Sequence, residues 1–199
     1  LNLGHPGIPE LGELNARLEP ITGFTCVAVP GLIPDEDFFA MLEQRVFPVG
    51  NFIRKRAQLD YLEEPDCFHD IFGHVPMLAD PVVADLMVEV GRLGSEACAA
   101  AQGHLVARIY WHSIEFGLAR EDGELRILGA GLASSFGESR YALENPGIDR
   151  RSFSLGEAVR TPYRHDAFQP LYLVADDLAE ALAAIRTANL DDLMRLAAG

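Results

Sequence analysis

Two histidines and three acidic residues lie close together in the segment 64–76, which reads EPDCFHDIFGHVP. Imidazoles at this density favour a metal site, because neutral imidazole is a common ligand of transition metals. In a regular α-helix, the five-residue step from His69 to His74 would place them about 140° apart around the axis. We therefore expect a bend or a helix end between them, and Gly73 and Pro76 are residues that weaken a regular helix.

A third ligand has to come from elsewhere, and Glu115 is the best candidate. It lies in the otherwise apolar segment 109–118, IYWHSIEFGL, where an unpaired charge would be costly to bury. Two imidazoles and one carboxylate form the facial triad of iron(II) oxygenases, which leaves coordination positions open on one face. Hydrolytic zinc sites use the same donors, although no glutamate follows His69 as a general base. Taken alone, each of these residues is more often an ordinary core or surface residue than a metal ligand. Taken together, their types favour iron only slightly over zinc.

The elements that must position these residues are mostly helical by their patterns. Apolar residues that recur every three or four positions after an acidic or proline start predict helices. We expect a helix of about three turns after Pro34, one with Pro65 in its first turn that runs until Gly73 and Pro76, one from Asp80-Pro81 to near Gly91 or Gly94, one over about 95–118, and one over 176–186. A short strand is expected at 171–174. The predicted fold class is mainly α with minor β.

Composition limits the classes of function. The chain has 199 residues, 49% of them hydrophobic, which predicts one domain over residues 1–199. Its net charge of −14 argues against nucleic acid and anionic membranes as partners. No apolar run approaches the roughly 20 residues that span a bilayer, and no leader pattern opens the chain. Three scattered cysteines indicate reduced thiols. We expect a cytoplasmic protein.

Five collinear segments carry a family resemblance: VPGLIP at 29–34, EPDCFHDIFGHVP at 64–76, IYWHSIEFGL at 109–118, GAGLASSFGE at 129–138 and FQPLYLVA at 168–175. In these segments the chain resembles the pterin-dependent aromatic amino acid hydroxylases, and most closely their bacterial phenylalanine 4-hydroxylases. The resemblance implies the single-domain catalytic fold of that family, Fe(2+) and a tetrahydropterin (tetrahydrobiopterin or a bacterial analogue) as cofactors, and a monooxygenase that converts phenylalanine to tyrosine with dioxygen in phenylalanine catabolism.

The resemblance also assigns roles to individual residues. It implies that the iron ligands, and hence the catalytic residues, are His69, His74 and Glu115. It implies that Arg54 grips the amino acid carboxylate, a task that suits a planar guanidinium. The other residues that it places at the substrate are Asp66, Trp111, Phe116, Ser134 and Glu138.

Among these, Asp66 would orient substrate or ligand, and Ser134 would bond a ligating imidazole, although either could simply cap a helix. Trp111 and Phe116 would form an aromatic wall, with Glu138 beside it. On the pterin side, the resemblance implies backbone pairing and ring stacking by Gly31, Leu32, Ile33 and Phe38, with Tyr110 on the far side.

Some positions depart from the animal members of the family. Pro48 stands where those have a histidine near the pterin, and Leu62 where they have a threonine near the substrate. Their regulatory domain and tetramerisation helix have no counterpart in this sequence, so we expect a monomer. Because the chain begins at Leu1 rather than Met, we expect further native residues before it, which would affect the pterin pocket.

Two alternatives stay open. One is hydroxylation of tryptophan or another arene by the same chemistry, although Trp111 stands where tryptophan hydroxylases usually carry phenylalanine. The other is a catalytically silent protein that binds an aromatic amino acid or pterin.

Overall fold

Helix α5 (Pro81–Ala99) and the helices around it form the centre of the fold in the computed structural model, which describes residues 1, 3–4, 7–59 and 64–199; Leu62 lies outside this part of the chain. The expected start of this helix is confirmed, because the Asp80 side chain accepts hydrogen bonds from the backbone N–H groups of Val82 and Val83 at 2.8 and 3.4 Å. Such a cap satisfies N–H groups that have no partner within the helix.

The expected end of this helix near Gly91 or Gly94 is wrong, because α5 continues to Ala99. These glycines instead allow close packing against α2 (Asp35–Glu43). A Cβ on Gly91 would lie 2.3 Å from the Glu43 nitrogen, and one on Gly94 would lie 2.2 Å from Cγ of Phe39. Their helical cost, about 1 kcal/mol each relative to alanine, is thus offset by contact between the two helices.

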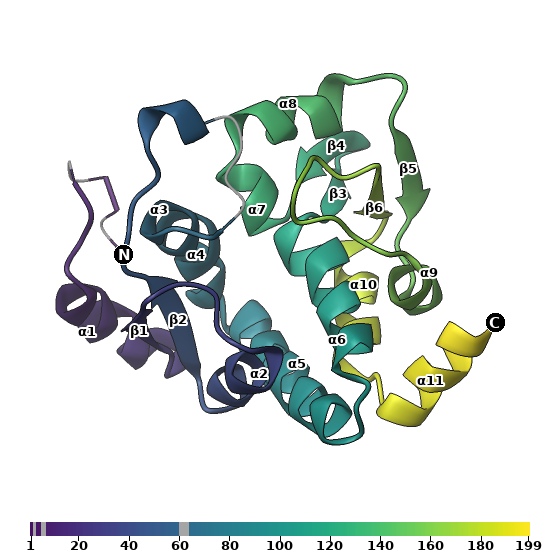
Figure 1. Ribbon diagram of the computed structural model, residues 1–199, viewed down its shortest axis with the longest axis horizontal. Coiled ribbons are helices and arrows are strands. Elements are labelled where there is room, and N and C mark those ends of the chain that lie inside the picture. Colours follow the sequence, from purple (N-terminus) through teal and green to yellow (C-terminus); the bar gives the residue numbers. More distant parts are fainter. Residues whose placement is uncertain (2, 5–6, 60–63) are drawn as a thin grey trace.

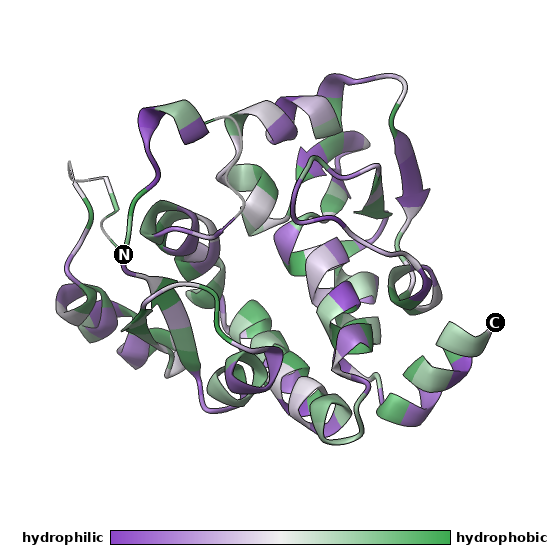
Figure 2. Cartoon of the chain, in the orientation of Figure 1, coloured by the Kyte–Doolittle hydropathy of each residue, from purple (hydrophilic) through white to green (hydrophobic). Residues whose placement is uncertain are grey.

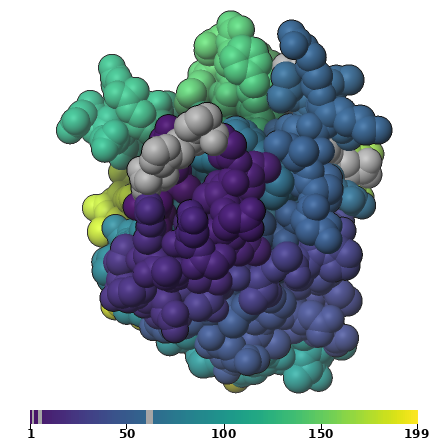
Figure 3. Space-filling view, turned by 90° about the vertical axis from the view of Figure 1, so that its left-hand side faces the viewer, coloured from purple at the N-terminus to yellow at the C-terminus, as the bar shows by residue number. Residues whose placement is uncertain are grey.

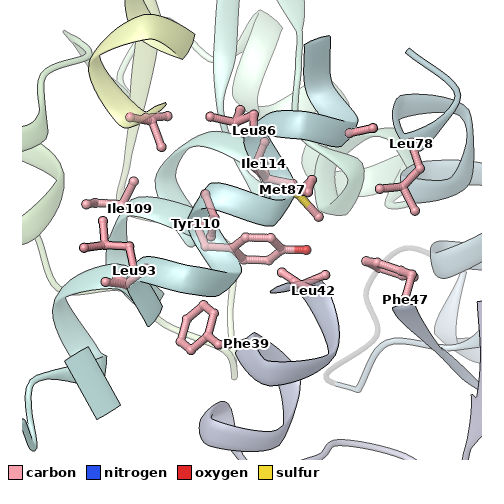
Figure 4. Packing of buried hydrophobic residues seen from close by; sticks show 14 of the residues in the cluster. Phe39, Leu42, Phe47, Leu78, Leu86, Met87, Leu93, Ile109, Tyr110 and Ile114 are labelled. Atoms are coloured by element: carbon pink, nitrogen blue, oxygen red, sulfur yellow. The ribbon is translucent and has the colours of Figure 1, made fainter. Parts of the chain in front are cut away.

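The main hydrophobic core lies where α2, α5 and α6 (Gly103–Tyr110) meet. Figure 4 shows Phe39 and Leu42 of α2 beside the Tyr110 ring of α6, and Ile109 of α6 and Leu93 of α5 belong to the same cluster. Phe47 and Leu78 close the far end of the same cluster. This packing fixes α6, and with it the segment that follows, relative to the N-terminal half of the chain.

The N-terminal third consists of α1 (Leu11–Thr22), β1 (Thr25–Val29), α2 and β2 (Val46–Gly50). Strands β1 and β2 pair in parallel with Val29 opposite Gly50, and α2 connects them. The predicted helix after Pro34 is confirmed as α2, which ends at Glu43. Residues of this third occupy most of the face seen in Figure 3.

The predicted helix over 95–118 is only partly correct. Helix α5 ends at Ala99, α6 begins at Gly103, and a π-helical segment, η3 (Trp111–Glu115), follows directly. Ala101 has a φ of 57°, a left-handed conformation that ends a helix. Leu118 already belongs to the next strand.

A four-stranded sheet lies on the other side of α6 and η3 (Figure 1), in the order β4-β3-β6-β5. Its strands are β3 (Leu118–Glu121), β4 (Glu124–Ile127), β5 (Asp149–Ser152) and β6 (Leu171–Ala175). The predicted strand at 171–174 is confirmed as β6, which is buried along its whole length. The edge strand β5 is hydrophilic throughout (Figure 2), as exposed edges usually are.

The remaining helices complete a mainly α fold with minor β, as predicted. They are α3 (Cys67–His69), the π-helical η2 (Asp70–His74), α4 (Val75–Leu78), α7 (Ala130–Ala133), α8 (Phe136–Glu144), α9 (Leu155–Arg160), α10 (Leu178–Arg186) and α11 (Leu190–Ala198), together with the 3₁₀ turn η1 (Arg56–Gln58). Helix α10 confirms the helix predicted over 176–186. In the described part of the chain, no single helix is both long enough and apolar enough to cross a membrane. The helical segments Cys67–Leu78 and Pro81–Ala99 have the required length and apolarity only when they are taken as a pair, and this pair is bent by 110°.

Candidate active site

The two histidines lie on a continuous helical stretch, and the predicted interruption at Gly73 and Pro76 is wrong. Asp66 caps α3 by accepting a hydrogen bond from His69 N–H at 2.9 Å, so Pro65 precedes the helix and is not in its first turn. Between the histidines the helix widens into η2, where the Val75 N–H bonds to the Asp70 carbonyl five residues back. A wider turn brings residues five apart toward one face.

Glu115 is also the last residue of a π-helical turn. Segment η3 runs from Trp111 to Glu115, and the Phe116 N–H donates to the Trp111 carbonyl at 2.8 Å, again five residues back. Close packing holds this turn in place: a Cβ on Gly129 would lie 2.1 Å from the Glu115 carbonyl oxygen. The chain therefore needs glycine at 129 to bring α7 against the turn that carries Glu115.

The ligand atoms of His69, His74 and Glu115 converge within 4.8 Å of one another. His74 Nε2 lies 3.0 Å from His69 Nε2 and 2.9 Å from Glu115 Oε1, and His69 Nε2 lies 3.5 Å from Glu115 Oε2. Donors that bind one metal ion at about 2.0–2.2 Å and at right angles lie about 3 Å apart. The three side chains thus fit a single transition-metal ion.

The charges in this cluster are strongly coupled. Burial opposes ionisation of Glu115, but the imidazoles of His74 and His69 outweigh it and lower the pKa of the carboxyl. Burial disfavours the charged form of His69, yet the Glu115 charge and hydrogen bond raise its pKa above the usual value. The Glu115 carboxylate is therefore held ionised beside the two imidazoles. A carboxylate must be ionised in this way to bind a metal cation.

Ser134 contacts the first of the two histidines. Its Oγ lies 2.8 Å from His69 Nδ1 and 3.3 Å from the Gly131 carbonyl, to which it donates. If His69 Nε2 faces a metal ion, Nδ1 carries the proton and donates it to Ser134 Oγ. Such a bond fixes both tautomer and ring orientation of a ligating histidine.

Arg54 and Asp66 form a buried ion pair next to this histidine. The Asp66 carboxylate accepts from Arg54 Nε at 3.0 Å and from its Nη2 at 2.7 Å, and Arg54 Nη1 donates to the Ser134 carbonyl at 2.6 Å. Burial would raise the pKa of Asp66, but the hydrogen bonds from Arg54 and from His69 N–H lower it. Arg54 also lies over the Phe68 ring, 5.2 Å from its centre, so its guanidinium is held rigidly.

A cavity of about 420 Å³ opens over the three converging ligands, a size typical of small-molecule sites. It is lined by every residue that the sequence analysis assigned to metal, substrate or pterin except Asp66, which is fully buried behind Arg54. On the predicted pterin side, the Phe38 and Tyr110 rings meet edge to face at 5.2 Å, and Gly31, Leu32 and Ile33 line the same wall.

On the predicted substrate side, Trp111 and Phe116 stack with ring centres 4.7 Å apart. Glu138 lines the same cavity, but its carboxylate accepts hydrogen bonds from Gln169 N–H at 2.8 Å and from the Tyr172 hydroxyl at 2.9 Å. Burial raises the pKa of Glu138. Its visible role is therefore to anchor the start of β6.

Several lining residues were missed by the sequence analysis, namely Asp35, Glu64, Asp70, Tyr163 and His165. Asp70 lies inside the histidine segment, and its type was a sufficient signal; its Oδ2 accepts from Gly50 N–H at 2.8 Å. Tyr163 and His165 lie between the segments that carry the resemblance, so nothing local pointed to them.

The chain matches the family model of the biopterin-dependent aromatic amino acid hydroxylases over residues 2–195. It is 50% identical over 178 residues to a phenylalanine-4-hydroxylase of Caulobacter vibrioides (89% of this chain, 60% of the relative) and 46% identical over 178 residues to that of Pseudomonas aeruginosa (89% and 67%). The chain thus spans about three fifths of the length of the Caulobacter relative.

Solved structures show the same likeness. A cobalt-bound phenylalanine hydroxylase from Chromobacterium violaceum superposes with a TM-score of 0.89 at 43% identity, covering 96% of this chain and 69% of that one. A phenylalanine hydroxylase from Legionella pneumophila gives 0.90 at 34% identity, covering 100% and 84%.

Proposed function

The chain belongs to the biopterin-dependent aromatic amino acid hydroxylases, and we propose that it is an iron(II)- and tetrahydropterin-dependent monooxygenase that hydroxylates phenylalanine to tyrosine. One observation carries the proposal: His69, His74 and Glu115 converge at a cavity that has an arginine and aromatic rings on its other walls. The metal donors, a carboxylate anchor and an apolar slot are thus present together.

Iron is the metal that this donor set fits best. Two imidazoles and one carboxylate leave one face of the ion open, and the cavity lies over them. When bound, iron and the reduced pterin together would supply the activation of dioxygen for ring hydroxylation. The protein's part is to hold the ligands in place, through Ser134 on His69, and to keep water from the reacting atoms.

Arg54 is suited to bind the carboxylate of the amino acid. Among the described residues, three of its five N–H groups are used by Asp66 and the Ser134 carbonyl, which leaves two for a ligand. A substrate carboxylate that leaves water needs such a paired, hydrogen-bonded cation. Because Asp66 and Ser134 fix the guanidinium before binding, little side-chain entropy is lost when the substrate arrives.

The aromatic residues form two apolar walls of the cavity, one on the substrate side and one on the pterin side. Trp111 and Phe116, stacked on each other, would form one wall beside the ring of the substrate, and Phe38 would stack on the pterin near the backbone of Gly31 and Ile33. The three binding functions therefore surround the metal ligands from different sides, as a reaction that joins metal, pterin and amino acid requires.

A single-turnover assay tests the proposal. The protein is loaded with iron(II) without oxygen, then given tetrahydropterin, dioxygen and one aromatic amino acid, and the products are identified by mass spectrometry. We expect tyrosine from phenylalanine, and none with Glu115→Ala. Glu144→Ala, which alters an exposed helix residue, is the matched control and should keep the activity. Stoichiometric binding of phenylalanine without any hydroxylated product would support the silent alternative instead.

We further propose that the chain acts as a single-domain monomer in the cytoplasm. The free cysteines Cys26, Cys67 and Cys98 fit a reducing compartment, and a net charge of −14 opposes self-association. Sedimentation equilibrium should give the mass of one chain, 21.8 kDa; a dimer mass at micromolar concentration would contradict the monomer.

A further inference from the structure

Two of the lining residues that the sequence analysis missed, Tyr163 and His165, lie on residues 161–169, which connect α9 to β6 and which we call the strap. Both of its ends are anchored. His112 Nε2 lies 3.0 Å from the Thr161 carbonyl oxygen, which can only accept, so Nε2 carries the proton. At the other end, Gln169 N–H donates to the buried Glu138 carboxylate at 2.8 Å.

The strap is also closed upon itself. The Gln169 side chain accepts a hydrogen bond from Arg164 N–H at 3.2 Å and donates one to the Arg164 carbonyl at 2.5 Å. These two bonds fix the backbone of the strap halfway along its course. Tyr163, which lies between the first anchor and Arg164, is therefore held in place from both sides.

Tyr163 stacks on Trp111, with ring centres 4.2 Å apart and planes only 15° apart. Trp111 also stacks on Phe116, with ring centres 4.7 Å apart and planes 26° apart. The indole therefore stacks both on a ring five residues further along its own segment and on a ring from the strap. Its Nε1 is buried and has no hydrogen-bond partner among the described residues, so no side-chain hydrogen bond of this kind orients the indole.

We propose that Tyr163 is a positioning residue that determines specificity: by clamping the Trp111 indole against Phe116, it fixes the width of the substrate slot and disfavours substrates larger than phenylalanine. The clamp acts through Trp111, and Tyr163 need not touch the reacting atoms. With the clamp removed, one face of the indole is free, and the ring can turn into the space that Tyr163 leaves. The specificity part of this inference rests on the proposed hydroxylase function.

The chain offers a direct reporter of the clamp, because Trp111 is its one tryptophan. Tyr163→Ala should shift the tryptophan emission to longer wavelength and increase its quenching by acrylamide, in the protein without substrate, iron or pterin. Tyr163→Phe keeps the stacking ring and should behave as the parent. Tyr163 is half-buried on a connecting segment, so we expect both variants to fold, and circular dichroism would verify it. Quenching in Tyr163→Ala equal to that of the parent would overturn the clamp.

Competition between phenylalanine and tryptophan then tests the specificity. In Tyr163→Ala the preference for phenylalanine should narrow by about two- to twelvefold, the range that one aromatic pair commonly contributes, and Tyr163→Phe should restore it. If quenching shows a freed indole in Tyr163→Ala but the ratio of phenylalanine to tryptophan hydroxylation equals that of the parent, Tyr163 does not determine specificity. If the parent hydroxylates neither amino acid, the proposed function fails, whereas the quenching result still decides whether the clamp exists.

Discussion

The buried carboxylate of Asp66 provides a strict test of how this site is held together. It accepts four hydrogen bonds, two on each oxygen: Oδ2 from Arg54 N and Nε at 2.7 and 3.0 Å, and Oδ1 from Arg54 Nη2 and His69 N at 2.7 and 2.9 Å. Asp66→Asn keeps the shape but replaces one oxygen with an NH₂ group. Whichever oxygen is lost, two bonds disappear, and a new donor faces two N–H groups.

The expected loss of stability follows from these contacts. Two charge-assisted hydrogen bonds contribute about 1.5–3 kcal/mol each, and breaking a buried ion pair on one side costs about 3–5 kcal/mol. The Asp66 and Arg54 side chains are only 0% and 5% exposed, so solvent screening is small. We therefore expect Asp66→Asn to lower the free energy of unfolding by about 3–5 kcal/mol.

Urea unfolding, followed by circular dichroism with a chelator present, measures this loss. Asp85→Asn is the matched control: its carboxylate pairs with Arg45 at 2.6 Å, but its side chain is 60% exposed, so the loss should be at most about 1 kcal/mol. Both variants remove one negative charge, which cancels the effect of net charge. Similar losses in the two variants would refute the reasoning.

The pH dependence of this loss has a definite sign. The pKa of Asp66 is lowered from its ordinary value of 3.8, so the carboxylate stabilises the fold at all pH values above that ordinary value. Its contribution disappears as pH falls through the lowered folded-state pKa. The difference between parent and Asp66→Asn should therefore stay constant near neutrality and shrink in acid.

Three further predictions concern metal and substrate. His69→Ala should abolish tight iron(II) binding in isothermal titration while the exposed His104→Ala should not, and the parent's affinity should fall as pH drops, because protons compete for the imidazoles. Arg54→Lys should raise the Michaelis constant for the amino acid by about 10- to 150-fold, equivalent to about 1.5–3 kcal/mol; an unchanged constant would exclude the assigned contact. Trp111→Phe should reduce the preference for phenylalanine over tryptophan, because overpacking of the substrate slot by a tryptophan substrate costs about 1–3 kcal/mol. If the ratio of phenylalanine to tryptophan hydroxylation were the same in parent and variant, Trp111 would not set the preference.

The sequence predicted well what depends on residue type and local pattern. Capping residues and apolar periodicity located α2, α5 and α10, and the metal ligands were chosen because their donor types suit one ion. It failed where the cause lies elsewhere in the chain. Gly91 and Gly94 resemble a helix end locally, and only the backbone of α2 packed against them explains why the helix continues. Tyr163 gave no signal, because its partner Trp111 is 52 residues away in a different element.

The two π-helical turns connect these failures with the chemistry. The sequence predicted a helix that Gly73 and Pro76 interrupt and a regular helix over about 95–118. Each of these regions instead contains one π-helical turn, and each turn ends on a metal ligand, His74 or Glu115. Such turns are rare in proteins, so they persist where tertiary structure enforces them. Here Gly73 packs on Ala130 of α7, and Gly129, which caps α7, packs on the carbonyl of Glu115. One short helix thus holds both widened turns, and a metal ion bound between their last residues would offset their cost.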